Sequence, residues 1–175
     1  MLIQDYKESW KDHFVQIKNV LDVALIDLDV TIEHVGSTSV PGLAAKPIID
    51  IDIACAKKVN FEAVRESLAS IGYTHKGDFG IPNREVFKRD FFLEKHYLLD
   101  AITHHLYVCL YGSEELKRHL QFRDFLIKNE EARIEYQNLK LLKKPTRFIQ
   151  NMRNLKKMLL VTLLMEYLMG YKLAF

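Results

Sequence analysis

Two aspartates, Asp50 and Asp52, interrupt an apolar stretch that reads PIIDIDI from Pro47 to Ile53. Because successive side chains of a β-strand point to opposite faces, both carboxylates should project from one face and the isoleucines from the other. Two ionised carboxylates this close repel each other, and a bound cation relieves that repulsion. Carboxylate oxygens suit Mg²⁺ or Mn²⁺, which also hold the phosphates of a substrate. The alternative is a strand whose second face is simply hydrated.

A Gly-Ser-Thr turn formed by Gly36, Ser37 and Thr38 precedes this strand and favours a phosphate site. Glycine allows a phosphate to approach the backbone closely, while hydroxyl and backbone N–H groups donate hydrogen bonds to it. Lys46, just before the strand, would add a positive charge, although a lysine at this place is also typical of a hydrated surface. Arg84, after a glycine-rich loop, suits either bidentate phosphate contact or a surface ion pair. These five residues are therefore candidates for binding a nucleotide or another phosphorylated small molecule.

A pair of adjacent histidines, His104 and His105, lies in the strand-like segment THHLYVC. Neighbours in a strand face opposite sides, so the two imidazoles cannot bind one metal ion. We expect His105 to share the face of the aspartates, as a phosphate donor or general base, because Leu106 and Val108 should line the buried face. His34, near the glycine turn, is either part of the site or a hydrogen-bonded core residue. The other histidines are interpreted as structural: His13, His75, His96 and His119.

Hydrophobic periodicity predicts the elements that position these residues. Strands are predicted over residues 30–35, 47–54, 73–76, 84–92 and 103–111. Helices are predicted over 6–28 and 61–71, the second closed by a glycine, and then near 113–129, 130–143 and 146–170. The pattern indicates an α+β fold with a core over residues 1–112 and a helical extension over 113–175, packed together as one compact unit.

The bulk composition is that of a globular protein. The chain has 175 residues, of which 49% are apolar and 27% charged. Its opening, MLIQDYKESW, lacks the apolar core of a signal peptide, so we expect a cytoplasmic protein. The longest apolar run, 158–171, is interrupted by Glu166 and is short for a bilayer, which favours a helix packed on the core and no membrane association. Cys55 and Cys109 suit reduced core positions better than a disulfide.

Charge is distributed unevenly along the chain. Residues 117–175 contain 13 Lys/Arg and 5 Asp/Glu, a balance of about +8, whereas residues 1–116 contain 12 and 18, a balance of about −6. A basic helical half could hold RNA or another anion, but its positive residues are scattered among apolar positions. Hydrated faces of amphipathic helices are the better interpretation, so a nucleic-acid partner is not favoured.

The stretch TIEHVGSTSVPGLAAKPIIDIDI strongly resembles the signature of the GrpB (UPF0157-type) family, which is placed in the nucleotidyltransferase superfamily. HKGDFGIPNREVF, HHLYVC, LKRHLQFRDFL and EYQNLK extend the resemblance to about residue 140. The resemblance implies a nucleotidyltransferase-like mixed sheet flanked by helices. It also implies that Gly36 and Ser37 contact nucleotide phosphates and that Asp50 and Asp52 bind the metal ion.

One departure from the superfamily pattern concerns the metal site. The resemblance implies a third carboxylate on a later strand, where this chain offers His104 and His105. Four acidic residues are candidates to replace it, and the sequence does not choose among them: Asp90, Asp100, Glu85 and Glu33.

The sequence therefore leads to competing functional expectations. The first is Mg²⁺- or Mn²⁺-dependent transfer of a nucleotidyl group from a nucleoside triphosphate to an unknown acceptor, with catalysis assigned to Asp50, Asp52 and His105. The second is a non-catalytic nucleotide- or anion-binding module. Family relatives fused to dephospho-coenzyme A kinase suggest that such a module is linked to coenzyme A metabolism. The third is an interaction protein whose basic helices bind a partner.

Overall fold

The computed structural model describes residues 2–56, 61–90, 92 and 95–141. Its strands are β1 (Val30–Val35), β2 (Ile49–Cys55), β3 (Tyr73–His75), β4 (Arg84–Arg89) and β5 (His104–Leu110). Its helices are α1 (Ser9–Ala24), α2 (Phe61–Ser70), α3 (Tyr97–Ala101), α4 (Glu114–Lys128) and α5 (Glu130–Leu141), with a 3₁₀ turn, η1 (Ser37–Ser39), between β1 and β2. The chain divides into two compact units, Met1–Lys128, which contains all these strands, and Asn129–Phe175, which contains α5.

The strands form one mixed sheet in the order β1-β2-β5-β4-β3. All neighbours pair antiparallel except β2 and β5, which are parallel. A parallel pair needs a long crossover connection, and here the crossover contains α2, β3, β4 and α3. The aspartate strand β2 consequently lies between β1 and β5, which are far apart along the sequence.

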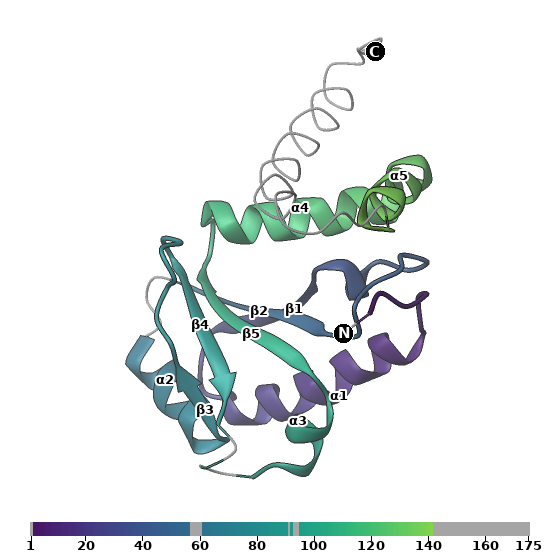
Figure 1. Cartoon of the computed structure of the whole chain (residues 1–175). Helices are drawn as coiled ribbons and strands as arrows, with labels where there is room; N and C mark the ends of the chain where they lie inside the picture. The colour runs from purple at the N-terminus through teal and green to yellow at the C-terminus, as the bar shows by residue number, and fades with distance from the viewer. Residues whose placement is uncertain (1, 57–60, 91, 93–94, 142–175) are drawn as a thin grey trace. The chain divides into compact units, whose positions relative to one another are not determined.

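One face of the sheet is apolar and is covered by helices. Ile49, Ile51 and Ile53 of β2 are at most 1% exposed, and they share the main core with Leu106 and Val108 of β5. The helices contribute further buried residues to this core: Trp10, Ile17, Leu21, Val64, Leu68 and Leu99. Figure 1 shows α1 and α3 on this side of the sheet and α4 on the other. The opposite face, which carries the aspartates, is therefore the one that α4 covers.

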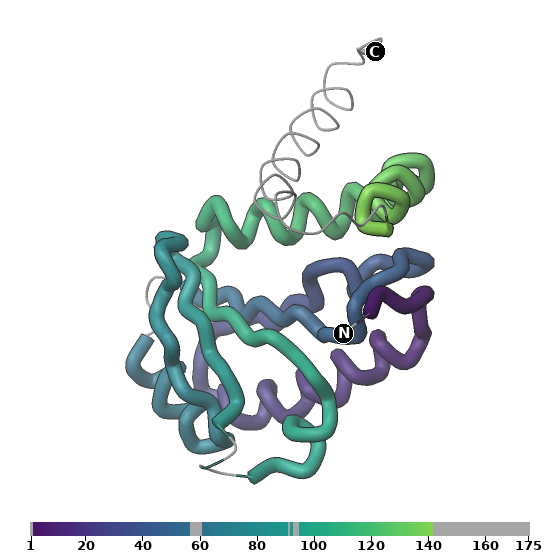
Figure 2. The backbone as a smooth tube through the Cα atoms, viewed as in Figure 1, coloured from purple at the N-terminus to yellow at the C-terminus, as the bar shows by residue number. Residues whose placement is uncertain are grey.

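The segment before α1 is fastened to the loop before β2. Gln4 and Ala45 exchange two backbone hydrogen bonds, of 2.8 and 2.9 Å. In Figure 2 the purple N-terminal segment runs beside the blue loop that follows η1. The loop between the glycine turn and the aspartate strand is therefore fixed both by the strands that it joins and by the N-terminal segment.

The predicted fold class is confirmed: the structure is α+β, with a mixed sheet flanked by helices. All five predicted strands are present, with ends that differ by a few residues, and both cysteines are buried free thiols. Helix α3 was not predicted, because five residues are too few to show a helical period. The structure divides the chain after residue 128 and not after residue 112, so α4 groups with the sheet.

Two predicted features concern residues after residue 141. The helix expected over 146–170 and the apolar run over 158–171 lie outside the described residues. Among the residues that are described, no helix is both long enough and apolar enough to cross a membrane.

Candidate carboxylate site

Asp50 and Asp52 lie on the face of β2 opposite the buried isoleucines, as strand alternation predicts. Residues in register on paired strands share a face, so Asp52 is flanked by Glu33 of β1 and Tyr107 of β5. The two carboxylates differ sharply in exposure, because the Asp50 side chain is 31% exposed whereas that of Asp52 is sealed from solvent at 0%. Asp50 is therefore the solvent-exposed member of the pair, whereas Asp52 lies in the interior.

The glycine turn approaches Asp50 so closely that it excludes a side chain. Gly36 has φ +73° and ψ −167°, a region that is essentially restricted to glycine. A Cβ atom added to Gly36 would lie 2.3 Å from Oδ2 of Asp50, well inside van der Waals contact. Ser37 follows as the first residue of η1, and its hydroxyl makes no hydrogen bond to any described residue. The Gly36 backbone and the Asp50 carboxylate are therefore brought together where β1 ends and β2 begins.

His105 forms a dyad with Asp50. The two residues are in register on the parallel strands β2 and β5, and Nδ1 of His105 lies 2.9 Å from Oδ1 of Asp50. Because an ionised carboxylate only accepts hydrogen bonds, we assign the imidazole proton to Nδ1, so Nε2 is the nitrogen that could act as a base. Half of the His105 side chain is exposed. The structure thus places His105 on the aspartate face, as the sequence predicts, and orients it there.

A second histidine, His119 of α4, holds the buried aspartate. Its Nδ1 lies 2.7 Å from Oδ2 of Asp52, and its Nε2 lies 3.1 Å from Oε1 of Glu115, one helical turn earlier. Although burial lowers the pKa of His119, its hydrogen bonds to these two carboxylates raise that pKa to about 9. Burial raises the pKa of Asp52, but the imidazole bridges two acids, so we assign the shared proton to His119. The histidine is therefore an imidazolium at neutral pH.

Arg123 of α4 holds the third acidic side chain of this face. Its Nη1 donates to Oε2 of Glu33 at 2.8 Å and to the backbone carbonyl of His34 at 3.0 Å, and its Nε donates to Asp124. Helix α4 is also anchored by Leu116, which packs against the sheet. Because His119 and Arg123 are four residues apart, one face of α4 presents both cationic side chains to the acidic strand face.

The four candidates for a third carboxylate lie in different places. Glu33 alone belongs to the aspartate face, where Arg123 already binds it. Glu85 pairs with His75, Asp100 pairs with Arg89, and Asp90 accepts from Thr74. No group of three or more Asp, Glu, His or Cys residues in the described part of the chain is arranged to hold a metal ion by itself.

Thr38 and His34, which the sequence placed near the phosphate turn, belong to the interior. Thr38 is 2% exposed, and its hydroxyl donates to the carbonyl of Ile48 while contacting Nε2 of His34. His34 stacks on Phe14 of α1, and burial, which outweighs the opposing effect of Asp50, lowers its pKa to about 4. The hydroxyl of Thr38 is therefore used inside the fold and is not free to donate to a phosphate.

Lys46 and Arg84, the two cationic candidates, lie in different surroundings. Lys46 is exposed before β2 and forms no ion pair with another described residue. Arg84 lies on the aspartate face, but its guanidinium stacks on Tyr107 with 4.9 Å to the ring centroid and pairs with Glu115 at 3.5 Å. Its buried Nε has no hydrogen-bond partner among the described residues. Arg84 thus lies on the acidic face beneath α4. Lys46 has no ion-pair contact with an acidic side chain among the described residues.

His104 agrees with the sequence interpretation, whereas His119 departs from it. His104 points to the core face, where Tyr73 contacts its Nε2 at 2.5 Å and the carbonyl of Ile102 contacts its Nδ1 at 2.6 Å. This agrees with the expectation that only one of the adjacent histidines reaches the site. His119 was interpreted as structural because neither its spacing nor its neighbours in sequence connect it to Asp52, 67 residues away.

Two features of this site fit a divalent cation. Oδ1 of Asp52 is buried, and neither this oxygen nor Oδ2 of Asp50 accepts a hydrogen bond from a described residue. Magnesium is commonly bound by one or two carboxylates, with substrate phosphates and water completing its coordination. Asp50 and Asp52 are therefore the residues that could hold one Mg²⁺ ion, with phosphate and water oxygens completing its coordination.

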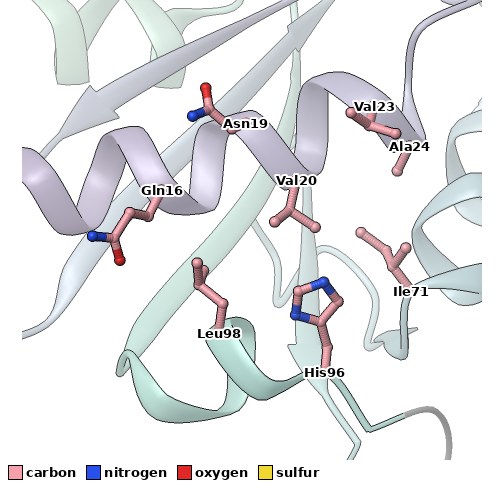
Figure 3. A pocket seen from close by; sticks show the side chains of 8 residues that line it. All are labelled: Gln16, Asn19, Val20, Val23, Ala24, Ile71, His96 and Leu98. Carbon is pink, nitrogen blue, oxygen red and sulfur yellow. The ribbon is translucent and has the colours of Figure 1, made fainter.

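A separate hollow lies away from the carboxylates. It has a volume of about 470 Å³ and is lined by α1 residues such as Val20 and Val23, together with Ile71, His96 and Leu98 (Figure 3). Its lining is mainly apolar and comes from the helices that cover the core face. It offers no acidic or phosphate-binding group, so it is not part of the candidate site.

Comparison with solved structures supports this fold. The crystal structure of conserved protein GrpB from Enterococcus faecalis superposes with a TM-score of 0.74 at 26% identity, covering 95% of this chain and 99% of that one. A structure of the Cid1 poly(U) polymerase with MgGTP bound gives a TM-score of 0.52 at 12% identity, covering 75% of this chain and 41% of Cid1. The second likeness shows that the fold is nucleotidyltransferase-like.

Sequence comparison gives the family. The chain is 34% identical over 135 residues to the UPF0157 protein YqkA of Bacillus subtilis, a match that covers 77% of this chain but 37% of YqkA. It is 32% identical over 141 residues to the glutamate-rich protein GrpB of Alkalihalophilus pseudofirmus, covering 80% of this chain and 79% of that protein. The model of the GrpB protein family matches residues 1–154. The chain therefore belongs to the GrpB family.

Proposed function

We propose that this protein transfers a nucleotidyl group from a nucleoside triphosphate to an acceptor hydroxyl or phosphate on the aspartate face, with Mg²⁺ or Mn²⁺ held by Asp50 and Asp52. The observation that carries the proposal is the unpartnered Oδ1 of Asp52, in a strand whose neighbouring Asp50 is in close contact with the Gly36 turn. A buried carboxylate oxygen without a partner is costly, and a cation is the ligand that would satisfy it. The nucleotidyltransferase-like fold supports the same conclusion.

The residues of the chain would divide the work as follows. Gly36 leaves room for phosphate beside the backbone, and the free hydroxyl of Ser37 would donate to it. The acceptor oxygen would attack the α-phosphorus. The bond between the α-phosphorus and the oxygen that bridges to the β-phosphate would break, and pyrophosphate would leave. His105, oriented by Asp50, would take the proton from an acceptor hydroxyl at Nε2. The cation, when bound, supplies stabilisation of the negative charge on the leaving pyrophosphate.

The relatives support a nucleotide as ligand. The solved Cid1 structure holds MgGTP, and its fold resembles this one over 75% of the present chain. The chain covers well under half of YqkA and of Cid1, so base preference and acceptor are not transferred from either protein.

A second candidate function is nucleotide or anion binding without catalysis. The observation in its favour is that β5 presents His105 and Tyr107, not a carboxylate, opposite the two aspartates. The remaining acid of the face, Glu33, is already paired with Arg123. A site with two carboxylates could bind a metal–nucleotide complex and still fail to activate the acceptor.

Binding by isothermal titration calorimetry tests the site. ATP, GTP, CTP and UTP would be titrated with and without Mg²⁺ into the wild-type chain and into an Asp50→Asn/Asp52→Asn variant. We expect Mg²⁺-dependent binding of at least one triphosphate that this variant loses. The matched control is Asp27→Asn/Asp29→Asn, which removes two exposed aspartates at the same spacing and should bind as the wild type does.

Release of pyrophosphate then separates the two candidate functions. Turnover of a bound triphosphate with a supplied acceptor supports transfer, whereas tight binding with no release under any acceptor favours the binding module. If no triphosphate binds in the presence of Mg²⁺, both nucleotidyl transfer and nucleotide binding are wrong, and binding of another anion is the only form of the second candidate that stands.

A further inference from the structure

The two aspartates share an arrangement that the proposed function does not explain. Each gives one oxygen to Nδ1 of a histidine: Oδ1 of Asp50 to His105 at 2.9 Å and Oδ2 of Asp52 to His119 at 2.7 Å. In each, the second oxygen has no hydrogen-bond partner among the described residues. The histidines come from different elements, β5 and α4, so the arrangement is a property of the tertiary structure and not of one local motif.

We propose that His119 is a positioning residue, which fixes the carboxylate of Asp52 through Oδ2 so that Oδ1 remains available for the cation, with Glu115 fixing the imidazole in turn. This inference rests on the proposed function, because it assigns a role toward the same metal site. It extends that function to helix α4, from which no site residue was assigned.

Burial makes the position of the Asp52 carboxylate depend on His119. The Asp52 side chain is 0% exposed, so water cannot replace a lost hydrogen bond, and His119 is its one side-chain partner among the described residues. The imidazole is itself only 24% exposed and is held from its other nitrogen by Glu115, whose side chain is 9% exposed. Arg118 and Arg84 hold Glu115 from two further directions. Each residue in the series of contacts from Asp52 through His119 to Glu115 is therefore fixed by a further hydrogen bond or ion pair.

Metal sites commonly use such a second layer of contacts. Hydrogen bonds to the ligating carboxylates orient them, and loss of one such partner typically costs about 10–100-fold in metal affinity. Without His119, both oxygens of Asp52 would lack a partner and the carboxylate could rotate away from Asp50. We therefore expect weaker metal binding even though no metal ligand has been changed.

The test measures Mn²⁺ affinity of the full chain by electron paramagnetic resonance, with Mn²⁺ as the probe. His119→Asn keeps a donor near the position of Nδ1 and should retain the Asp52 hydrogen bond, whereas His119→Gln moves its amide toward Glu115 and His119→Ala removes both. We expect His119→Ala and His119→Gln to weaken Mn²⁺ binding at least about tenfold, and His119→Asn to stay within about threefold of wild type.

The matched control is His75→Ala. His75 also pairs with a carboxylate, Glu85 at 2.6 Å, but on the β3–β4 side of the sheet, so its loss should leave Mn²⁺ affinity unchanged. Far-ultraviolet circular dichroism of each variant at the assay temperature would establish that it is folded. Rescue by asparagine but not by glutamine is the signature that a merely structural role of His119 would not produce.

The outcomes are distinguishable. If the wild type binds Mn²⁺, Asp50→Asn/Asp52→Asn abolishes binding and folded His119→Ala binds as the wild type does, the positioning role is wrong and the metal site stands. Tighter binding by His119→Ala would also overturn the inference, because it would show that the imidazolium competes with the cation. If the wild type binds no Mn²⁺ with or without ATP, the metal site itself is wrong, and the positioning role with it.

Discussion

Replacing Gly36 with alanine tests the closest approach in the site. Two costs add in this variant. The backbone of Gly36, at φ +73° and ψ −167°, is in a region that costs a residue with a side chain about 1–3 kcal/mol. The new Cβ would also lie 2.3 Å from Oδ2 of Asp50, and overpacking of this kind typically costs another 1–3 kcal/mol or so. We expect Gly36→Ala to lower the free energy of unfolding by roughly 2–6 kcal/mol.

The assay is urea denaturation, with two comparisons that separate the terms. Gly80→Ala has a similar positive φ of +76° but nothing within 4 Å of the added Cβ, so it should show the cost of a positive φ without a steric contact. In an Asp50→Ala background the 2.3 Å contact disappears and the nearest remaining Asp50 atom is Cβ, at 3.0 Å. Gly36→Ala should therefore cost less by at least about 1 kcal/mol there than in the wild type.

Two results would refute this reasoning. Equal costs of Gly36→Ala in the two backgrounds, within about 0.5 kcal/mol, would mean that Asp50 does not exclude the side chain. A cost below about 0.5 kcal/mol in the wild-type background would mean that the turn does not require the glycine-only conformation. Either result would remove the structural reason for the close approach of phosphate at Gly36.

Two further predictions concern the groups around the site. Burial lowers the pKa of His34 to about 4, so its imidazole is neutral in the folded protein at neutral pH. In the unfolded chain the imidazole has its ordinary pKa of about 6.5 and therefore binds a proton at a higher pH than it does in the folded protein. The contribution of His34 to the free energy of unfolding should therefore be constant above about pH 6.5 and should decrease as the pH falls toward 4. Urea denaturation across this range should show a smaller loss for His34→Gln, and parallel curves would contradict the assignment. Arg123→Ala leaves Glu33 and the carbonyl of His34 without this donor and should cost about 1–3 kcal/mol by the same assay, with Arg123→Lys only partly restoring it because one ammonium cannot reproduce the planar fork. A loss below about 0.5 kcal/mol for Arg123→Ala would show that the ion pair does not hold α4 to β1.

Local sequence patterns predict the parts of the site that lie on single strands. Strand alternation in PIIDIDI places Asp50 and Asp52 on one face, and the buried Leu106 and Val108 identify His105 as the histidine that shares it. These inferences succeed because a period of two depends only on neighbouring residues. The parallel pairing of β2 with β5 then brings His105 to Asp50, which is a contact between residues 55 apart.

The contribution of α4 was not predictable in the same way. Helical periodicity over 113–129 indicates a buried face but not which face of the sheet it covers, so neither His119 nor Arg123 could be linked to an acid on β1 or β2. The internal hydrogen bonds of the Thr38 hydroxyl were not predictable for a related reason. A hydroxyl beside glycine predicts a phosphate donor, yet its hydrogen bonds to His34 and to the carbonyl of Ile48 depend on how the turn folds back on the strands.

Helix α4 explains part of the uneven distribution of charge along the sequence. Part of the basic excess after residue 116 meets the acidic excess before it, because Arg123 binds Glu33 and Arg118 binds Glu115. With His119 as an imidazolium on Asp52, the buried acids of this face are neutralised within the protein. The carboxylate pair therefore does not need a cation merely to relieve repulsion, which was the first reason to expect one. The stronger reason is that neutralisation by His119 uses only one oxygen of Asp52 and leaves the other, in the interior, without a hydrogen bond.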